Sequence, residues 1–557
     1  MRRPRAPIAT SEGDRRWSRR NAGSGQEGTR ETALRGGNPD RRRPAAQDHL
    51  GMQTRTPREI LVGIDVGTTA LKAAAFDARD GKTLARASEA LHVISGADGR
   101  REQSPLSVDR ALGRCIGALQ ARLGAAWRRV SGLGLAAQGG SGVIADRRTC
   151  RAFTPLVLWN DGRTFRRQAG IAAMKPRGYW RALTLHDRPG AGLGRLLWIQ
   201  EREPELFRES NIYVGAGEYV FFRLTGVWRQ DAGNALQIGC YDAVRRRLVQ
   251  GPLDLVSLPL SFVAPLREGH ETHPLSPKSA KRLDLPAGVP VAGPYLDQEA
   301  GYLAAVGISD RPLQCSLGTA WVGNFVVPEN HGGHAPFQLV LPSPVSEGRL
   351  IVMPLLTGNV AWEWALATFI AARGGESLKA AETVFRESLL PPSGLVAVPW
   401  LTRGNPFDSS KVGAGCFVGL NAHVSGEDLL RAVAAGMCFE FARVFANVMR
   451  SGLVDGVVLA GGASKGPYFR QMLAALFAPL PVFHMEEEDT AAARGALHAF
   501  LAQAAPARVV RVRPPSKRTR EAIEERSDLY RRAFDSLYGG IAEGKPYSTT
   551  GAKEKRK

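Results

Sequence analysis

Apolar and polar positions divide this chain into short buried strands and amphipathic helices. The clearest pattern covers residues 59–77: an apolar run at 60–64, a turn at Gly67-Thr68-Thr69, and a return through 71–76. Such an almost charge-free run followed by a glycine-containing turn predicts a β-hairpin whose first strand is central in a sheet. Asp65 stands at the end of that first strand, directly before the turn.

Strand and helix patterns alternate from residue 60 to about residue 307. We expect helices over 107–123, with Ser107 as N-cap, and over 194–202 and 216–224. We expect strands over 130–137, 143–146, 156–158 and 289–293. Strands that are followed by helices predict an α/β architecture.

A second unit begins near residue 312 and repeats the first motif. A strand at 314–317 runs into Gly318-Thr319, and a return strand covers 321–327. This repetition predicts two related halves, each with its own hairpin. Further along, we expect strands over 454–459 and 481–483, and helices over 425–450 (N-cap Ser425), 467–477, 490–502 and 520–537.

Three glycine turns follow strand ends, at Gly67-Thr68-Thr69, Gly318-Thr319 and Gly461-Gly462. Backbone N–H groups without bulky side chains can approach phosphate oxygens closely, and Asp65 could hold Mg²⁺ through its waters. Each turn alone is more often an ordinary turn, and Asp65 alone could be an acid beside a hairpin. Three such turns in this order favour a nucleotide site between two domains.

Composition narrows the class of protein. The chain has 557 residues, enough for more than one domain, and a net charge of +21. Much of that charge lies in the two ends, where residues 1–57 and 507–557 each carry +7, so we expect no nucleic-acid partner. No apolar run is long enough to span a bilayer, and no signal peptide is visible. The six scattered cysteines suit reduced thiols in a cytoplasm.

Residues 1–57 are rich in Arg, Gly and Pro, which predicts a disordered basic tail. A mitochondrial transit peptide is the weaker interpretation, because Glu12, Asp14, Glu27 and Glu31 are out of place in one. Met52 offers a natural start of translation.

Deleting residues 1–51 is therefore expected to leave melting temperature and turnover unchanged. A large loss of either, measured by thermal unfolding and an activity assay, would show that the tail packs on the body.

Several motifs together resemble one family, the FGGY carbohydrate kinases, within the superfamily of sugar kinases, actin and heat-shock chaperone ATPases. The hairpin motif is shared across the superfamily, whereas the Trp159 and Glu203 stretches are more particular to sugar kinases. The matching stretches, which span about residues 60–505, are Gly63-Ile64-Asp65-Val66-Gly67-Thr68-Thr69 with Lys72 and Asp77, Trp159-Asn160-Asp161-Gly162-Arg163, Leu197-Trp198, Glu203-Pro204-Glu205-Leu206-Phe207, Arg223-Leu224-Thr225-Gly226, Asp297-Gln298, Ser316-Leu317-Gly318-Thr319 and Val458-Leu459-Ala460-Gly461-Gly462-Ala463-Ser464-Lys465.

The resemblance implies two actin-like ATPase (ribonuclease H-like) domains with an interdomain cleft. It places an N-terminal, sugar-binding domain at 58–308, a C-terminal, nucleotide-binding domain at 309–505, and a helix with a basic tail at 506–557. The implied reaction is transfer of a phosphoryl group from ATP, with Mg²⁺, to a hydroxyl of a small sugar or polyol.

The resemblance also implies roles for individual residues. Asp297 would be the general base, and Asp65 would lie near the water shell of Mg²⁺. The residues implied to bind the nucleotide are Gly67, Thr68, Thr69, Lys72, Gly318, Thr319, Gly461, Gly462, Ser464 and Lys465. The residues implied to bind the substrate are Gln138, Gly139, Gly140, Trp159, Asp161, Arg163, Asp297 and Gln298, although Asp161 and Arg163 could equally form a structural ion pair beside the pocket.

The chain departs from the family pattern at Gly139-Gly140, where xylulose kinases carry Met-His. Two glycines remove an imidazole partner, so we predict that D-xylulose is not the substrate. Either a bulkier substrate fills the gap or side chains such as Trp159 or Tyr295 enter it. The alternatives left open are a xylulose kinase proper and a catalytically weak sugar-binding regulator, and the oligomeric state is open, with a homodimer as one option.

Overall fold

A computed structural model describes residues 59–318, 320–331, 338–355, 358–370, 377–401, 415–501 and 507–538. The predicted basic tail at 1–57, with its alternative start at Met52, lies outside these residues, as does the extreme C-terminus. Among the helices that the structure describes, none combines the length and apolar character needed to cross a bilayer.

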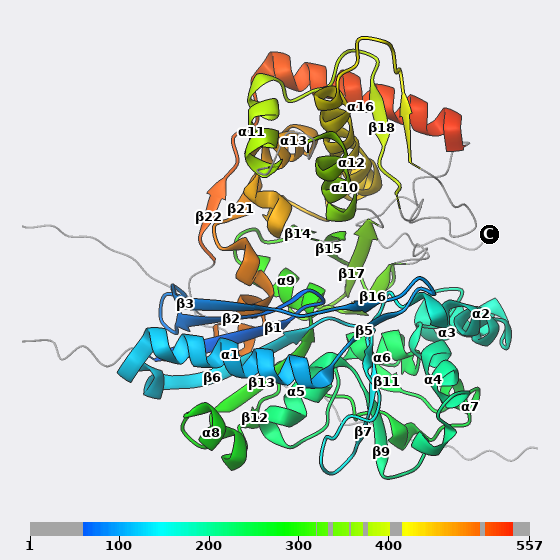
Figure 1. Cartoon of the computed structure of the whole chain (residues 1–557), viewed down its shortest axis with the longest axis vertical. Coiled ribbons are helices and arrows are strands. Elements are labelled where there is room, and N and C mark those ends of the chain that lie inside the picture. Colours follow the sequence, from blue (N-terminus) through cyan, green and yellow to red (C-terminus); the bar gives the residue numbers. More distant parts are fainter. Residues whose placement is uncertain are drawn as a thin grey trace, which may run out of the picture. The chain divides into compact units, whose positions relative to one another are not determined.

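The first sheet is built around the predicted hairpin, which is confirmed as β1 (Ile60–Val66) and β2 (Ala70–Asp77). β1 pairs antiparallel with β2 and parallel with β6 (Val130–Ala137), and β6 pairs parallel with β13 (Pro290–Leu296). The edges are β3 (Thr83–Ala90) and β12 (His273–Pro274). Because β1, β6 and β13 run in one direction, their carboxyl ends meet at one sheet edge (Figure 1).

The second sheet repeats this arrangement around β14 (Pro312–Leu317). β14 pairs antiparallel with β15 (Trp321–Val327) and parallel with β20 (Gly456–Ala460), which pairs parallel with β21 (Val482–Met485). The same succession of pairings around β1 and β14 agrees with the predicted relation between the two halves. The outer strands are β17 (Arg349–Leu355), β16 (Leu339–Pro342) and β22 (Val509–Arg511).

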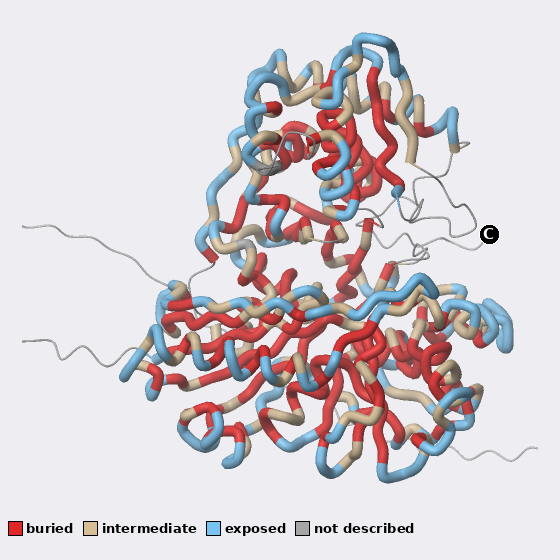
Figure 2. The backbone as a smooth tube through the Cα atoms, in the orientation of Figure 1, coloured by how far each residue is buried: buried red, intermediate tan, exposed pale blue. Residues whose placement is uncertain are grey.

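The central strands are buried on both faces, which explains their near-continuous apolar sequences (Figure 2). One face of the first sheet is covered by α1 (Pro105–Leu123), α5 (Ala216–Thr225) and α8 (Pro277–Leu283). On β1, Gly63 leaves room for α14 (Ala491–Gly495), since a Cβ there would lie 1.9 Å from the carbonyl oxygen of Ala493. A segment from the end of the chain thus packs on the first strand.

Helices of the second half pack into one large core. The predicted helix at 425–450 is confirmed as α12 (Gly426–Arg450), and Ser425 and Asp428 form a capping box at its start. The C-terminal helix is α16 (Lys517–Tyr538), whose Tyr530 hydroxyl donates to the buried Glu440 at 2.9 Å. The remaining helices and strands here are α10 (Asn359–Phe369), α11 (Ser377–Glu387), α13 (Pro467–Leu476), β18 (Val396–Val398) and β19 (Cys416–Val418).

The segments between β6 and β13 form a smaller apolar core of their own. They carry the candidate substrate residues beside the carboxyl edge of the first sheet. The elements are β7 (Val143–Asp146), β8 (Leu156–Val157), α2 (Phe165–Ala173), α3 (Arg177–Thr184), α4 (Gly192–Gln200), β9 (Asn211–Val214), α6 (Ala232–Ile238), β10 (Tyr241–Asp242), β11 (Arg247–Leu248) and α7 (Gly251–Asp254), while β4 (Ile94–Ser95) and β5 (Arg101–Gln103) precede β6 in the chain.

Two local predictions were wrong. The first helix begins at Pro105 with Ser104 as N-cap, because proline suits the first helical turn, so Ser107 lies inside the helix. The single helix expected over 490–502 is divided into α14 and α15 (His498–Leu501). Between them the backbone takes a tighter turn, with Leu497 N–H donating to the Arg494 carbonyl, and Leu497 packs under the first hairpin.

Candidate active site

Two acidic side chains lie at the carboxyl edge of the first sheet. Asp65 is the penultimate residue of β1, and Asp297 follows β13 directly as the first residue of α9 (Asp297–Ala305). Adjacent strands are about 4.8 Å apart, so β1 and β13, on either side of β6, are about 10 Å apart at this edge. The two carboxylates therefore stand on either side of the end of β6, close enough for their charges to interact.

Asp65 has an unsatisfied carboxylate. Its Oδ1 atom is buried and accepts no hydrogen bond from any described residue. Burial raises the pKa of Asp65 to about 6, partly offset by the positive charge of Lys72, which pairs with it across the hairpin. A buried carboxylate oxygen without a hydrogen-bond partner lowers the stability of the fold unless a bound ligand supplies that partner.

Asp297 has the electrostatic character of a base. Burial raises its pKa to about 7, and the negative charge of Asp65 raises it further, whereas hydrogen bonds from Gln298 act in the opposite direction. The Gln298 backbone N–H donates to Asp297 Oδ1 at 2.8 Å. A carboxylate with a pKa near neutrality can accept a proton from a hydroxyl group during a reaction.

The first glycine turn, Gly67-Thr68-Thr69, lies beside Asp65. Gly67 N–H donates to the Ala70 carbonyl at 3.0 Å, which closes the turn, and Thr69 is exposed. Thr68 Oγ1 lies 3.0 Å from Gln138 Oε1 and 3.2 Å from the indole nitrogen of Trp159. The turn is therefore fixed from the side of β6.

Gln138 directly follows β6 and holds this turn. Its Oε1 accepts from Thr68 and Ser141, at 3.0 and 3.1 Å, while its Nε2 donates to the Gly67 carbonyl and to Gln103, at 3.2 and 3.0 Å. All four hydrogen-bonding positions of this buried amide are thus taken by the protein. In this arrangement Gln138 positions the glycine turn and has no group left for a substrate.

Trp159 is the exposed aromatic side chain of the site. Its backbone N–H donates to Ser141 Oγ at 3.1 Å, and its side chain is 42% exposed. An indole held at both backbone and ring, with much of its surface in solvent, is suited to packing against an apolar face of a ligand.

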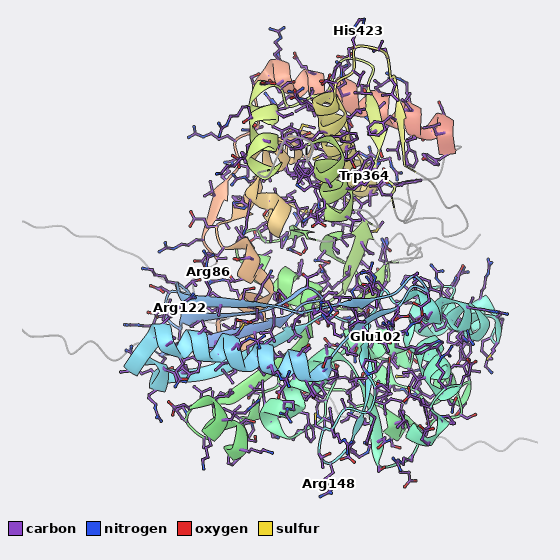
Figure 3. All side chains as sticks on the ribbon, viewed as in Figure 1. Arg86, Glu102, Arg122, Arg148, Trp364 and His423 are labelled. Atoms are coloured by element: carbon purple, nitrogen blue, oxygen red, sulfur yellow. The ribbon has the colours of Figure 1, made fainter. Side chains whose placement is uncertain are left out.

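Asp161 and Arg163 form a salt bridge within their own loop. Asp161 is fully buried, caps the short helix at 162–164, and pairs with Arg163 at 2.6 Å. Arg163 also contacts Glu102, labelled in Figure 3, and its guanidinium lies 4.5 Å from the ring centre of Trp198. The family-like stretch at 159–163 is thereby locked onto β5 and α4.

The turns of the second half are arranged around β14 and β20. Thr319 lies outside the described residues. Gly461 has φ +89°, and a Cβ there would lie 2.8 Å from the backbone of Leu317, so only glycine suits this position. A Cβ on Gly318 or Gly462 would meet no atom nearer than 3.9 Å, so a side chain would fit at either position. Ser464 is buried with Oγ donating to the Gly461 carbonyl at 2.6 Å, whereas Lys465 is exposed.

Gln237, a residue that sequence reasoning missed, reaches the glycine pair from α6. A Cβ on Gly139 would lie 2.1 Å from Gln237 Nε2, and a Cβ on Gly140 would lie 2.4 Å from its Oε1. Trp159 also reaches this space, with its Cβ 3.3 Å from the same point at Gly140, whereas Tyr295 has its ring against Gly269. No sequence motif marked Gln237. It lies on the seven-residue helix α6, about a hundred residues after the glycine pair, so only the folded structure brings the two together.

Buried acids, also missed, support the strand that ends at Asp297. Asp231 Oδ1 accepts from Asn234 N–H at 2.7 Å, which caps α6, and Oδ2 accepts from Leu296 N–H at 2.7 Å. Burial raises the pKa of Asp231 to about 6 and that of its neighbour Glu218 to about 8. The N-cap position of Asp231 was the one local signal that could have found it.

Comparisons with known proteins agree with this geometry. The model of the FGGY family of carbohydrate kinases matches in both parts, its N-terminal domain at residues 60–304 and its C-terminal domain at 315–504. A xylulose kinase from Escherichia coli is 28% identical over 74% of this chain and 84% of its own, and a glycerol kinase from Methylobacterium nodulans is 27% identical over 80% and 89%. The crystal structure of a xylulose kinase from Rhodospirillum rubrum, at 20% identity, superposes with a TM-score of 0.72 over 86% of this chain and 99% of its own.

This chain belongs to the FGGY family of carbohydrate kinases. Its two sheets are those of the two-domain actin-like ATPase fold, as the resemblance implied. It is a carbohydrate kinase, which transfers a phosphoryl group from ATP to a sugar or polyol.

Proposed function

We propose that this kinase phosphorylates a hydroxyl group of a small ketose or polyol, with Asp297 as the general base. The observation that carries the proposal is the meeting of Asp297, Asp65 and the first glycine turn at one sheet edge. The pKa of Asp297, raised to about 7, supports its role.

In the proposed step, the substrate hydroxyl oxygen attacks the γ-phosphorus of ATP. Its proton passes to the carboxylate of Asp297, the bond from the γ-phosphorus to the bridging oxygen breaks, and ADP leaves with that oxygen. Backbone N–H groups at Thr68 and Thr69 and at the second-half glycines would hold phosphate oxygens, where small residues allow close approach. Proton acceptance and positioning are thus the work of this chain's own groups.

Asp65 fits the protein side of a Mg²⁺ site. The described residues contain no cluster of three or more metal-binding side chains, but Mg²⁺ in kinases is bound through one or two carboxylates, waters and the substrate's phosphates. The unpaired Oδ1 of Asp65 suits that arrangement. When bound, Mg²⁺ would neutralise charge that develops on the phosphate oxygens.

Trp159 would pack against the carbon skeleton of the substrate, and Asp161 with Arg163 would hold its loop in place. The exposed indole and the buried ion pair support this division of roles. The six cysteines are free thiols, which supports a reducing, cytoplasmic setting.

A second candidate is a xylulose kinase proper. Several curated relatives at 23–28% identity are xylulose kinases, which favours this substrate. Against it stands the pair Gly139-Gly140, whose side-chain space is taken by Gln237.

A coupled ADP-release assay over D-xylulose, D-ribulose, D-fructose, erythritol and xylitol decides between these candidates. We expect clear stimulation by at least one compound, with D-xylulose poorer than the best by roughly 10-fold or more, since each unpaired hydroxyl costs about 1–3 kcal/mol. D-xylulose as best substrate by a clear margin would establish the second candidate. No stimulation by any compound would favour a sugar-binding regulator on this fold.

A further inference from the structure

The side chain of Gln237 lies where a side chain at residue 139 or 140 would otherwise stand. Its Nε2 atom is 2.1 Å from the Cβ position of Gly139, and its Oε1 atom is 2.4 Å from that of Gly140. The Cβ positions of both glycines are therefore occupied by the side chain of another residue. The glycine pair makes room for a carboxamide that comes from α6, about a hundred residues further along the chain.

The hydrogen-bonding groups of Gln237 are largely unused. Nε2 donates to the Gly233 carbonyl at 3.4 Å, at the long limit for such a bond, and Oε1 accepts from no described residue. By contrast, Gln138 at the same edge has every position filled. Gln237 is also only half-buried. Its amide can therefore bind a ligand at the cost of at most one long protein hydrogen bond.

The neighbours of Gln237 place it beside the proposed base. The point 2.1 Å from its Nε2 is also 2.4 Å from Leu296 Cδ1, and Leu296 directly precedes Asp297. On its other side the amide faces Trp159, whose Cβ is 3.3 Å from the Cβ position of Gly140. The carboxamide is thus close to Leu296, the residue before the base, and to the Cβ atom of Trp159.

Asp231 connects the helix of Gln237 to the strand that precedes Asp297. One of its oxygens caps α6, and the other accepts from the Leu296 N–H, each at 2.7 Å. A single carboxylate therefore connects the helix that carries Gln237 to the strand that directly precedes Asp297. Because this helix is fixed relative to the strand, the amide of Gln237 is held in a constant position for binding a ligand atom.

We propose that Gln237 binds a hydroxyl or carbonyl oxygen of the sugar or polyol and determines which substrate is accepted, an inference that rests on the proposed function. A carboxamide both donates and accepts, so it can pair with a hydroxyl in either direction. A compound without an oxygen at that position leaves the amide unpaired and is rejected.

The test compares wild type with Gln237→Met, which keeps the length of the side chain but removes both hydrogen-bonding groups. The substrates are the best compound of the panel above and its monodeoxy analogues. For the parent compound we expect kcat/KM to fall roughly 10–100-fold, mainly through KM, with KM for ATP unchanged. For the one analogue that lacks the contacted oxygen, we expect the two enzymes to agree within about threefold.

Gln200→Met, on α4, is the matched control and is expected to behave as wild type with every substrate. Gln237→Leu is a second apolar variant, expected to repeat the result if Gln237→Met unfolds. Unchanged efficiency, or an equal loss with every analogue, would overturn the role of Gln237 alone. If wild type responds to no compound, the proposed function fails, and this inference fails with it.

Discussion

Replacing Asp297 by asparagine is expected to lower phosphoryl transfer by roughly 10²–10⁴-fold while ATP binding is retained. An amide of the same shape cannot accept the proton of the attacking hydroxyl. Burial and the charge of Asp65 raise the pKa of Asp297 to about 7, which suits the wild-type carboxylate to accepting that proton. Activity is measured with the best substrate of the panel, and ATP affinity by titration calorimetry.

The control for this variant is Asp310→Asn, which makes the same chemical change at an exposed carboxylate. It is expected to leave both activity and ATP affinity unchanged. If Asp297→Asn kept more than about a tenth of wild-type activity, the assignment of the base would be wrong.

Asp65→Asn is expected to lower kcat/KM by roughly 10²–10³-fold, comparable to the loss of one oxyanion-hole hydrogen bond. It should also raise the Mg²⁺ concentration that gives half-maximal rate, because the unpaired Oδ1 is the proposed contact to the ion's water shell. Mg²⁺ titration of the steady-state rate measures this effect. An unchanged Mg²⁺ dependence would contradict the assignment.

Asp65→Asn should also shift the pH dependence of kcat/KM, and the direction of the shift follows from the loss of a negative charge. Asp297 must be ionised to accept a proton, and its pKa is raised to about 7, so wild-type kcat/KM is expected to fall as pH drops through about 7. Removing the negative charge of Asp65 lowers the pKa of Asp297, so the acidic limb of the residual activity should move to lower pH. A limb that stays in place, or moves upward, would show that another group titrates.

Local sequence patterns were sufficient to predict the main strands and helices. The hairpin at 59–77, the strand at 130–137 and the helix at 425–450 are confirmed, because each depends on an apolar period or a cap within a few residues. The family and the two related halves also followed from short motifs. By contrast, the helix expected over 490–502 is divided, since its path is set by packing on a strand more than four hundred residues earlier.

Within the candidate site, the sequence determined which residues stand at strand ends: Asp65, Gln138 and Asp297, together with the glycine turns. Tertiary structure decided which of them remain available to a ligand. Gln138 is fully engaged by partners 35 and 70 residues away, while Gln237, which no motif marked, reaches the glycine pair with its amide largely unused. The physical reason is that apolar periodicity is a local property, whereas hydrogen-bond saturation and desolvation depend on groups that only folding brings together.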